Sequence, residues 1–232
     1  FFTDYSQESH SNRDKFMQDF TPIEVSKIIN NQIVEPEYVA DICAGIGGLS
    51  VPILEKYPNV KIYCEELSAR VIPLLLFNLS YRNADAIVVH GDSLNREKEA
   101  IYKLSKTERY SDIEIIEDVP NIKADVVVMN PPYSLKHEWD YKNPDERFTA
   151  YSQPPKQYSD LGFVIHGLSK LKDTGKLWAI LPHGVLFRSN KEKNIRQEFI
   201  NSKILKTVVG LPSNIFLNTS IPVCLLELEK DS

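Results

Sequence analysis

The sequence has few of the residues that build disulfide frameworks or metal centres, with three cysteines and five histidines among 232 residues. Cys43, Cys64 and Cys224 are odd in number, lie in apolar segments and form no Cys-x-x-Cys pair, and the histidines are scattered. These absences argue against a disulfide-stabilised secreted domain and against a bound metal. We expect free, buried thiols in a reducing cytoplasm.

Long hydrophobic runs are missing as well. No apolar stretch approaches the roughly 20 residues that a membrane-spanning helix needs, and the chain does not open with a basic segment followed by an apolar one. We therefore predict a cytoplasmic protein without a membrane partner.

Positive charge is not in excess either, since 27 Lys and Arg residues and 32 Asp and Glu residues give a net charge of −5. This balance argues against a protein that binds nucleic acid over its whole surface, so a nucleic-acid substrate would require a local patch or a partner. The basic side chains between Arg188 and Lys206 are more simply interpreted as a solvated helix face. With 42% hydrophobic residues, the chain can bury an ample core as a single domain spanning residues 1–232.

Apolar segments with helical and strand periodicity alternate along the chain, which predicts an α/β fold with a mostly parallel seven-stranded sheet and helices on both faces. The last two strands are too close in sequence for a helical crossover, so they should form an antiparallel hairpin at one edge. Thr21 is expected to cap the first helix, and the acidic residues 108–120 to form an exposed excursion. Strands are predicted near residues 38–43, 60–65, 86–90, 124–129, 176–181, 206–210 and 223–229. Helices are predicted near residues 22–32, 47–56, 68–81, 95–106, 158–172 and 189–201.

A glycine turn follows the first predicted strand, in the run Asp41-Ile-Cys-Ala-Gly45-Ile-Gly47-Gly48. Glycines let the backbone approach a ligand, and the helix beyond the turn presents unpaired N–H groups to an anionic group such as a carboxylate. The spacing differs from the G-x-G-x-x-G fingerprint, which argues against a nicotinamide or flavin cofactor. Taken alone, the turn could equally be a structural corner between strand and helix.

Acids also end the next two predicted strands. Glu66 is preferred over Glu65 because it lies at the tip of the second strand, and Asp92 follows the third. In nucleoside-binding α/β domains, a carboxylate about 20 residues beyond the glycines binds the ribose hydroxyls, and Asp92 would accept from an adenine amino group of the same ligand. Each acid could instead be a solvated strand end or a helix cap. Their convergence with Asp41 and Asn130 on one crevice favours a binding site.

The fourth predicted strand of the chain, residues 124–129, leads into Asn130-Pro131-Pro132-Tyr133. The side-chain oxygen of Asn130 and the carbonyl of Pro131 are candidate acceptors for both hydrogens of a planar NH2 group, such as the exocyclic amine of adenine. Accepting both hydrogens favours a nucleophilic amine. Tyr133 could stack on a base turned out of its duplex. The alternative is an ordinary strand followed by a turn.

The next segment, residues 134–157, is long for a loop and contains Trp139, Tyr141, Phe148 and Tyr151 beside several cations. Aromatic side chains interleaved with cations suit a loop that closes over a flipped base or its phosphates. Acids in the same segment cancel its charge, so a loop packed on its own aromatics is an equally good interpretation.

Further motifs occur in order along the chain: Phe20-Thr-Pro22, DICAGIGG, NPPY, Asp145-Glu-Arg-Phe148, Tyr158-Ser-Asp-Leu-Gly-Phe163, Leu181-Pro-His-Gly-Val-Leu-Phe187 and Gly210-Leu-Pro-Ser-Asn-Ile-Phe216. From about Gln18 to Lys230, this pattern resembles the catalytic domain of the modification subunit of type I restriction-modification systems. The NPPY and glycine motifs are shared by many amino-methyltransferases, whereas the opening FTP and the last two motifs are more specific to these adenine DNA methylases.

The resemblance implies a Rossmann-like methyltransferase fold, S-adenosylmethionine as methyl donor and N6 of adenine in DNA as acceptor. Asn130, Pro131, Pro132 and Tyr133 would hold the target base, with residues 134–157 as the target-base loop. The residues implied to bind the cofactor are Phe20, Thr21 and Pro22 at its methionine end, Asp41, Ala44, Gly45 and Gly47 in the methionine pocket, Glu66 at the ribose and Asp92 at the adenine. The family usually has Asp-Pro before the glycines and a cysteine at the place of Ala44, so this sequence departs from it there.

Members of this family act with a separate specificity subunit, and in restriction systems with a restriction subunit. They commonly carry a helical region before the catalytic domain, so residues 1–17 are expected to be an N-terminal extension or a truncated remnant of that region. Two alternatives remain open at this stage. NPPY motifs also serve methylation of RNA bases and of protein glutamine, and a methyltransferase-like subunit can bind without catalysis.

Overall fold

The computed structural model describes residues 21–216 and 221–230. Phe20 and residues 1–17, which entered the predictions above, lie outside the described residues. None of the helices in the described ranges is long and apolar enough to cross a membrane.

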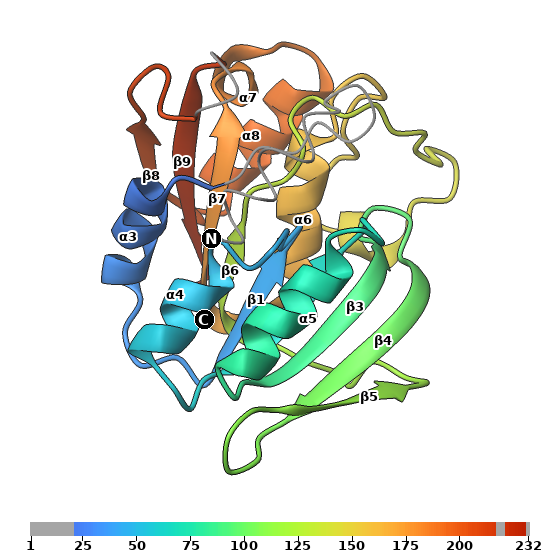
Figure 1. Ribbon diagram of the computed structural model, residues 1–232. Helices are drawn as coiled ribbons and strands as arrows, with labels where there is room; N and C mark the ends of the chain where they lie inside the picture. Colours follow the sequence, from blue (N-terminus) through green and yellow to red (C-terminus); the bar gives the residue numbers. More distant parts are fainter. Residues whose placement is uncertain (1–20, 217–220, 231–232) are drawn as a thin grey trace.

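The described residues form one nine-stranded sheet with the order β5-β4-β3-β2-β1-β6-β7-β9-β8 (Figure 1). Neighbours among β1, β2, β3, β6 and β7 pair in parallel, so the predicted mostly parallel α/β sheet is confirmed. The strands are β1 (Tyr38–Ile42), β2 (Lys61–Glu66), β3 (Asp85–Asp92), β4 (Glu97–Ser105), β5 (Asp112–Ile116), β6 (Ala124–Met129), β7 (Leu171–Pro182), β8 (Leu205–Gly210) and β9 (Val223–Glu229).

The predicted strand number of seven is wrong, because β4 and β5 extend the sheet beyond β3. A helix was predicted over residues 95–106, where Ile101 and Leu104 are spaced as on one helix face. In the strand β4 these two side chains lie on opposite faces of the sheet, and each is buried in a different hydrophobic core. Antiparallel pairing with β3 therefore overrides the local helical pattern. The acidic excursion is exposed as expected, but its central part is the strand β5.

Helices cover both faces of the sheet, as predicted (Figure 1). The core on one face packs α3, α4 and α5 against the sheet, and the core on the other face packs α6 and α8. The helices are α3 (Ile23–Gln32), α4 (Ser50–Lys56), α5 (Ile72–Tyr81), α6 (Asp160–Lys170), α7 (Gly184–Phe187) and α8 (Lys191–Asn201), with a 3-10 turn η1 (Glu146–Phe148). The expected Thr21 cap is wrong, because Pro22 occupies the cap position of α3.

The antiparallel hairpin predicted at one edge is confirmed, since β8 pairs with β9 and β9 pairs with β7, both antiparallel. The cysteines are free; Cys64 and Cys224 are buried as expected, whereas Cys43 is half-buried. The described residues contain no group of three or more His, Cys, Asp or Glu side chains that could hold a metal ion.

Candidate functional site

Four polar side chains predicted from the sequence lie on neighbouring parallel strands. Asp41 lies in β1, Glu66 is the last residue of β2, Asp92 is the last residue of β3, and Asn130 follows β6. In the register of the sheet, Ile42 pairs with both Glu65 and Met129, so the three central strands end at the same level. Because parallel strands end at one edge, the fold brings these groups together at the crevice where ligands of open α/β sheets bind.

Glu66 faces the glycine turn. Its Oε2 accepts a hydrogen bond from the backbone nitrogen of Gly45 at 2.8 Å, and its Oε1 accepts from the backbone nitrogen of Ser68 at 2.7 Å. The carbonyl of Glu65 accepts from the nitrogen of Ala44 at 2.9 Å. The end of β2 therefore holds the glycine turn through two successive residues, Glu66 through its side chain and Glu65 through its carbonyl.

Asp41 is buried and holds the first turn of α4. Its Oδ2 accepts from the backbone nitrogen of Ser50 at 3.0 Å. Burial raises the pKa of Asp41 to about 7; the hydrogen bonds from Ser50 oppose this rise and the Glu66 carboxylate adds to it. At neutral pH the carboxyl group of Asp41 is therefore close to its titration midpoint, which makes it sensitive to any charge that enters the crevice.

The backbone of the glycine turn borders open space at Gly45. Gly45 has φ of +57°, and a Cβ built on it would meet no atom within 4 Å. Gly47 has φ of +92°, and a Cβ there would lie 2.8 Å from Cγ2 of Val51. Cys43 adopts φ of +64° without being glycine. Gly45 thus borders open space, whereas Gly47 is required by close packing against α4.

Asp92 is half-buried and organises the turn after β3. Its Oδ1 accepts from the backbone nitrogen of Leu94 at 2.7 Å, and its Oδ2 accepts from the side-chain nitrogen of Asn95 at 3.0 Å. This turn leads into the strand β4 and not into a helix, so Asp92 is not the helix cap left open as an alternative. A carboxylate offers about four lone-pair positions, so this turn does not exhaust the capacity of Asp92 to accept from a ligand.

The Asn130 amide is held from two sides. Its Nδ2 donates to the Thr21 hydroxyl at 3.1 Å, and its Oδ1 accepts from the Tyr133 hydroxyl at 2.8 Å. Tyr133 is 6% exposed, and its ring lies edge-on to that of Phe216 with centroids 6.2 Å apart. The Tyr133 ring is buried in this arrangement, so stacking on a base requires neighbouring groups to move.

A buried ionic network lies behind the NPPY motif, and sequence analysis missed it. Ser134 has φ of +56°, and its nitrogen donates to Oδ1 of Asp160 at 2.8 Å. Arg188 donates to Oδ2 of Asp160 at 2.9 Å, to Oε1 of Glu192 at 3.0 Å and to the hydroxyl of Ser134 at 3.1 Å. Asp160 and Glu192 are 0% and 1% exposed. The sequence signal was an acid at the start of the apolar helix α6.

Most aromatic side chains of residues 134–157 pack onto the body of the protein. Trp139 and Phe148 are buried with ring centroids 5.2 Å apart, and a Cβ on Gly162 of α6 would lie 2.7 Å from the Trp139 ring. Tyr151 lies edge-on to Phe199 of α8. This geometry agrees with the interpretation of a loop packed on its own aromatics, and Tyr141, in contact with Lys191, is the exposed aromatic among the four.

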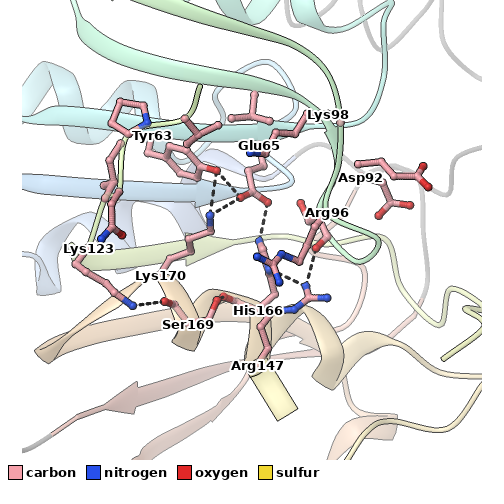
Figure 2. A pocket seen from close by; sticks show the side chains of 18 of the residues that line it. Tyr63, Glu65, Asp92, Arg96, Lys98, Lys123, Arg147, His166, Ser169 and Lys170 are labelled. Atoms are coloured by element: carbon pink, nitrogen blue, oxygen red, sulfur yellow. Dashed lines mark hydrogen bonds and ion pairs between the residues drawn. The ribbon is translucent and has the colours of Figure 1, made fainter. Parts of the chain in front are cut away.

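A cavity of about 550 Å³ lies on the face of the sheet that α6 covers, where β4 replaces the predicted helix (Figure 2). Of the predicted site residues that the structure describes, Asp92 alone lines it. Figure 2 shows Glu65, His166 and Lys170 converging in this cavity. Burial by itself would raise the pKa of Glu65, but the interactions with His166 and with the Lys170 ammonium more than offset it and hold this pKa well below its usual range.

The family model for N-6 DNA methylases matches residues 1–232. The chain belongs to the N-6 DNA methylase family. The sequence is 28% identical over 244 residues to the type I restriction enzyme MpnII methylase subunit of Mycoplasma pneumoniae, covering 98% of this chain and 42% of that protein. It is 32% identical over 232 residues to the MjaVIII methylase subunit of Methanocaldococcus jannaschii, covering 91% of this chain and 36% of that protein.

A solved structure of a related protein has the same fold as this N-6 DNA methylase family member. The type I restriction-modification methyltransferase subunit from Streptococcus thermophilus superposes with a TM-score of 0.76 and 29% identity, covering 92% of this chain and 45% of that one. The fold is thus the Rossmann-like fold of the methyltransferases. The chain spans less than half the length of each of these relatives, 42% and 36% for the two curated proteins.

Proposed function

We propose that this chain is the catalytic domain of an adenine-specific DNA methyltransferase, which transfers a methyl group from S-adenosylmethionine to N6 of adenine. The observation that carries the proposal is the Asn130 amide at the end of β6, held by Thr21 beside the glycine turn of β1. Methyl transfer to a base requires a hydrogen-bond acceptor for the target amine, placed next to a crevice that binds a nucleoside. The names of the relatives, type I restriction enzyme methylase subunits, support DNA as the substrate.

The crevice fits the proposed cofactor. Open space borders Gly45, and carboxylates stand at the ends of three successive strands. When bound, S-adenosylmethionine supplies an electrophilic methyl group on a sulfonium. The residues proposed to hold it are Phe20, Thr21 and Pro22 at the methionine end, Asp41, Ala44, Gly45 and Gly47 in the methionine pocket, Glu66 at the ribose and Asp92 at the adenine.

The chain's own contribution to the reaction is to orient the amine. Oδ1 of Asn130 and the carbonyl of Pro131 would accept its two hydrogens and hold the nitrogen in a fixed orientation, which lowers the entropic cost of the encounter with the methyl donor. Pro131 and Pro132 have no N–H groups, so this stretch of backbone offers acceptors without competing donors. The Tyr133 hydroxyl now occupies Oδ1 of Asn130 and must share or leave it when the amine arrives. After transfer, the extra proton leaves through these acceptors or water.

Recognition of a DNA sequence requires a partner in this proposal. With a net charge of −5, the chain has no overall excess of positive charge with which to bind the phosphate backbone of DNA. Arg188 and Arg196, which the sequence placed among the basic residues of one helix face, instead donate to groups of the chain itself. We therefore assign DNA recognition to a separate specificity subunit, with a restriction subunit as a further partner where cleavage accompanies methylation.

The deciding experiment compares the wild type with Asn130→Ala. Calorimetric titration with S-adenosylmethionine should give similar affinities for both proteins, because Asn130 is proposed to contact the amine of the target adenine and not the cofactor. Transfer of tritiated methyl to genomic DNA, measured with a co-expressed specificity subunit, should be lost in the variant. Near-normal transfer by Asn130→Ala would overturn the assignment.

A substrate panel separates the alternatives. Methyl transfer to adenine in DNA, with none to RNA or to a glutamine-containing peptide, is the expected result. Transfer to RNA or peptide alone would replace the DNA assignment, and cofactor binding without transfer to any substrate would identify a non-catalytic subunit.

A further inference from the structure

Arg147 lies in the 3-10 turn of the loop 134–157, and its guanidinium uses all five N–H donors inside the protein. The side chain is 4% exposed. Nε and Nη2 donate to the carboxylate of Asp145, at 3.0 Å and 2.6 Å. Nη1 donates to the Ser93 carbonyl at 2.8 Å and to Nδ1 of His166 at 2.9 Å, and Nη2 also donates to the Leu94 carbonyl at 2.7 Å. No donor is left for a ligand.

The contact with Arg147 sets the hydrogen-bond roles of the two ring nitrogens of His166. Because a guanidinium can only donate, Nδ1 of His166 must accept, and the ring proton lies on Nε2. Nε2 then donates to Oε2 of Glu65 at 2.7 Å, while Oε1 of Glu65 accepts from the Tyr63 hydroxyl at 2.6 Å (Figure 2). Arg147, His166 and Glu65 therefore form one directed chain of hydrogen bonds, buried on the α6 face of the sheet.

Both ends of this chain adjoin the proposed cofactor pocket. Ser93 and Leu94, whose carbonyls Arg147 holds, directly follow Asp92. Glu65 directly precedes Glu66, and its own carbonyl holds the nitrogen of Ala44. The side chains of Glu65 and Glu66 point to opposite faces of β2, so at this end the hydrogen-bond chain supports the pocket from the other face of the strand.

We propose that Arg147 is a positioning residue that ties the loop 134–157 to the adenosine end of the cofactor pocket, by fixing the turn after Asp92 and, through His166, the end of β2. This inference rests on the proposed function, because it assigns Asp92 and Glu66 to the cofactor. Preorganised groups lose affinity when the residues supporting them are left free to move. Arg147 acts without touching the ligand.

Substitution by lysine tests the guanidinium itself. Lysine keeps the charge but has three donors on one atom, so it cannot serve Asp145, His166 and both carbonyls at once. We expect Arg147→Lys to raise the KM for S-adenosylmethionine and the Kd for S-adenosylhomocysteine roughly tenfold to a hundredfold, with a much smaller change in kcat. A purely structural role would instead lower the melting temperature and the active fraction while leaving the Kd of the folded protein unchanged.

Arg96→Ala is the matched control. Arg96 pairs with Glu146 at 2.5 Å and so joins the same two segments, but both side chains are exposed. Exposed ion pairs contribute little to stability, so this variant should keep the wild-type Kd and KM within about twofold. An equal loss in both variants would mean that any contact between the segments suffices, and it would refute the specific role of Arg147.

Chemical rescue separates positioning from folding. Arg147 lines the 550 Å³ cavity, so Arg147→Ala leaves a space that small cations can enter. Millimolar guanidinium should restore part of the lost cofactor affinity, and methylammonium, with its single nitrogen, should not. Equal rescue by methylammonium, or wild-type affinity in both Arg147 variants, would refute the inference while leaving the proposed function intact. A wild type that neither binds cofactor nor transfers methyl would refute the proposed function and, with it, this inference.

Discussion

Thr21 and Asn130 are separated by 109 residues in sequence and joined by a hydrogen bond of 3.1 Å from the Asn130 amide nitrogen to the Thr21 hydroxyl. The bond orients an asymmetric group. An amide accepts only through its oxygen, so holding the nitrogen on Thr21 leaves the oxygen for the opposite side, where Tyr133 now donates to it. In the proposed reaction, Thr21 therefore determines the direction of the Asn130 side-chain oxygen, which accepts a hydrogen bond from the target amine.

Thr21→Ala should slow methyl transfer more than it weakens cofactor binding, to which Thr21 is also proposed to contribute at the methionine end. Loss of one hydrogen bond of about 1 kcal/mol leaves the Asn130 amide free to turn, which corresponds to roughly a fivefold to tenfold fall in the single-turnover rate. Thr21→Ser keeps the hydroxyl and should retain most of the rate. A normal rate in the alanine variant would show that Tyr133 alone orients the amide.

Asp41→Asn should remove a pH dependence from the free energy of unfolding. The pKa of Asp41 is raised from 3.8 to about 7, so the folded state binds this proton more tightly than the unfolded state. The contribution of this proton to the free energy of unfolding is fully present below about pH 4 and is lost as the pH rises through about 7. Asparagine can still accept from Ser50 and should therefore be more stable than the wild type at pH 8, by up to roughly 4 kcal/mol.

Urea unfolding of both proteins at pH 5 and pH 8 measures this difference directly. The advantage of Asp41→Asn over the wild type should grow from pH 5 to pH 8. If the two proteins lose or gain stability in parallel over this range, the carboxyl group of Asp41 does not titrate there.

Gly45→Ala and Gly47→Ala should fail in different ways. The methyl group at position 45 meets no atom within 4 Å but enters the open space proposed for the cofactor. Its stability cost should be only the roughly 1–2 kcal/mol of a left-handed non-glycine residue, with a larger loss in cofactor affinity. At position 47 the methyl group lies 2.8 Å from Val51, so overpacking adds a further cost of roughly 1–3 kcal/mol.

Thermal unfolding and calorimetric titration, performed on the same two variants, distinguish these outcomes. Gly47→Ala should have the lower melting temperature. Unchanged cofactor affinity in Gly45→Ala would place the ligand elsewhere in the crevice.

Arg188→Met should destabilise the protein by roughly 3–5 kcal/mol, because it leaves the buried carboxylates of Asp160 and Glu192 without their counter-ion. Burial already raises the pKa of Glu192, and Arg188 opposes that rise. The variant should therefore recover part of its stability at acid pH, where the Glu192 carboxyl group takes up a proton. Lys193→Ala, on the exposed side of α8, is the control and should change stability by less than about 0.5 kcal/mol.

Denaturant unfolding at pH 5 and pH 7 tests the charge argument for Arg188. A loss of the same size at both pH values would assign the role of Arg188 to packing, for example against the Tyr158 ring that it covers at 3.9 Å.

The misplaced helix at residues 95–106 shows where local pattern stops being informative. Ile101 and Leu104 satisfy a helical spacing, and nothing within the segment contradicts it. Their environment is decided by pairing with β3, which gives each side chain a separate core on a separate face of the sheet. Pairing between strands is non-local, so a window of local sequence does not contain it.

The sequence was enough to predict that the central strands are parallel and which polar residues end them, because strand periodicity and the glycine turn are local and parallel strands end at one edge. Asp41, Glu66, Asp92 and Asn130 were found in this way. The contacts of those groups depend on the tertiary structure: Thr21 on Asn130, Ser50 on Asp41, and the buried Arg147 and half-buried Arg188 behind the pocket and the motif. From sequence alone, a charged side chain is predicted to be exposed. It is buried only where distant segments supply hydrogen-bond partners for its donors.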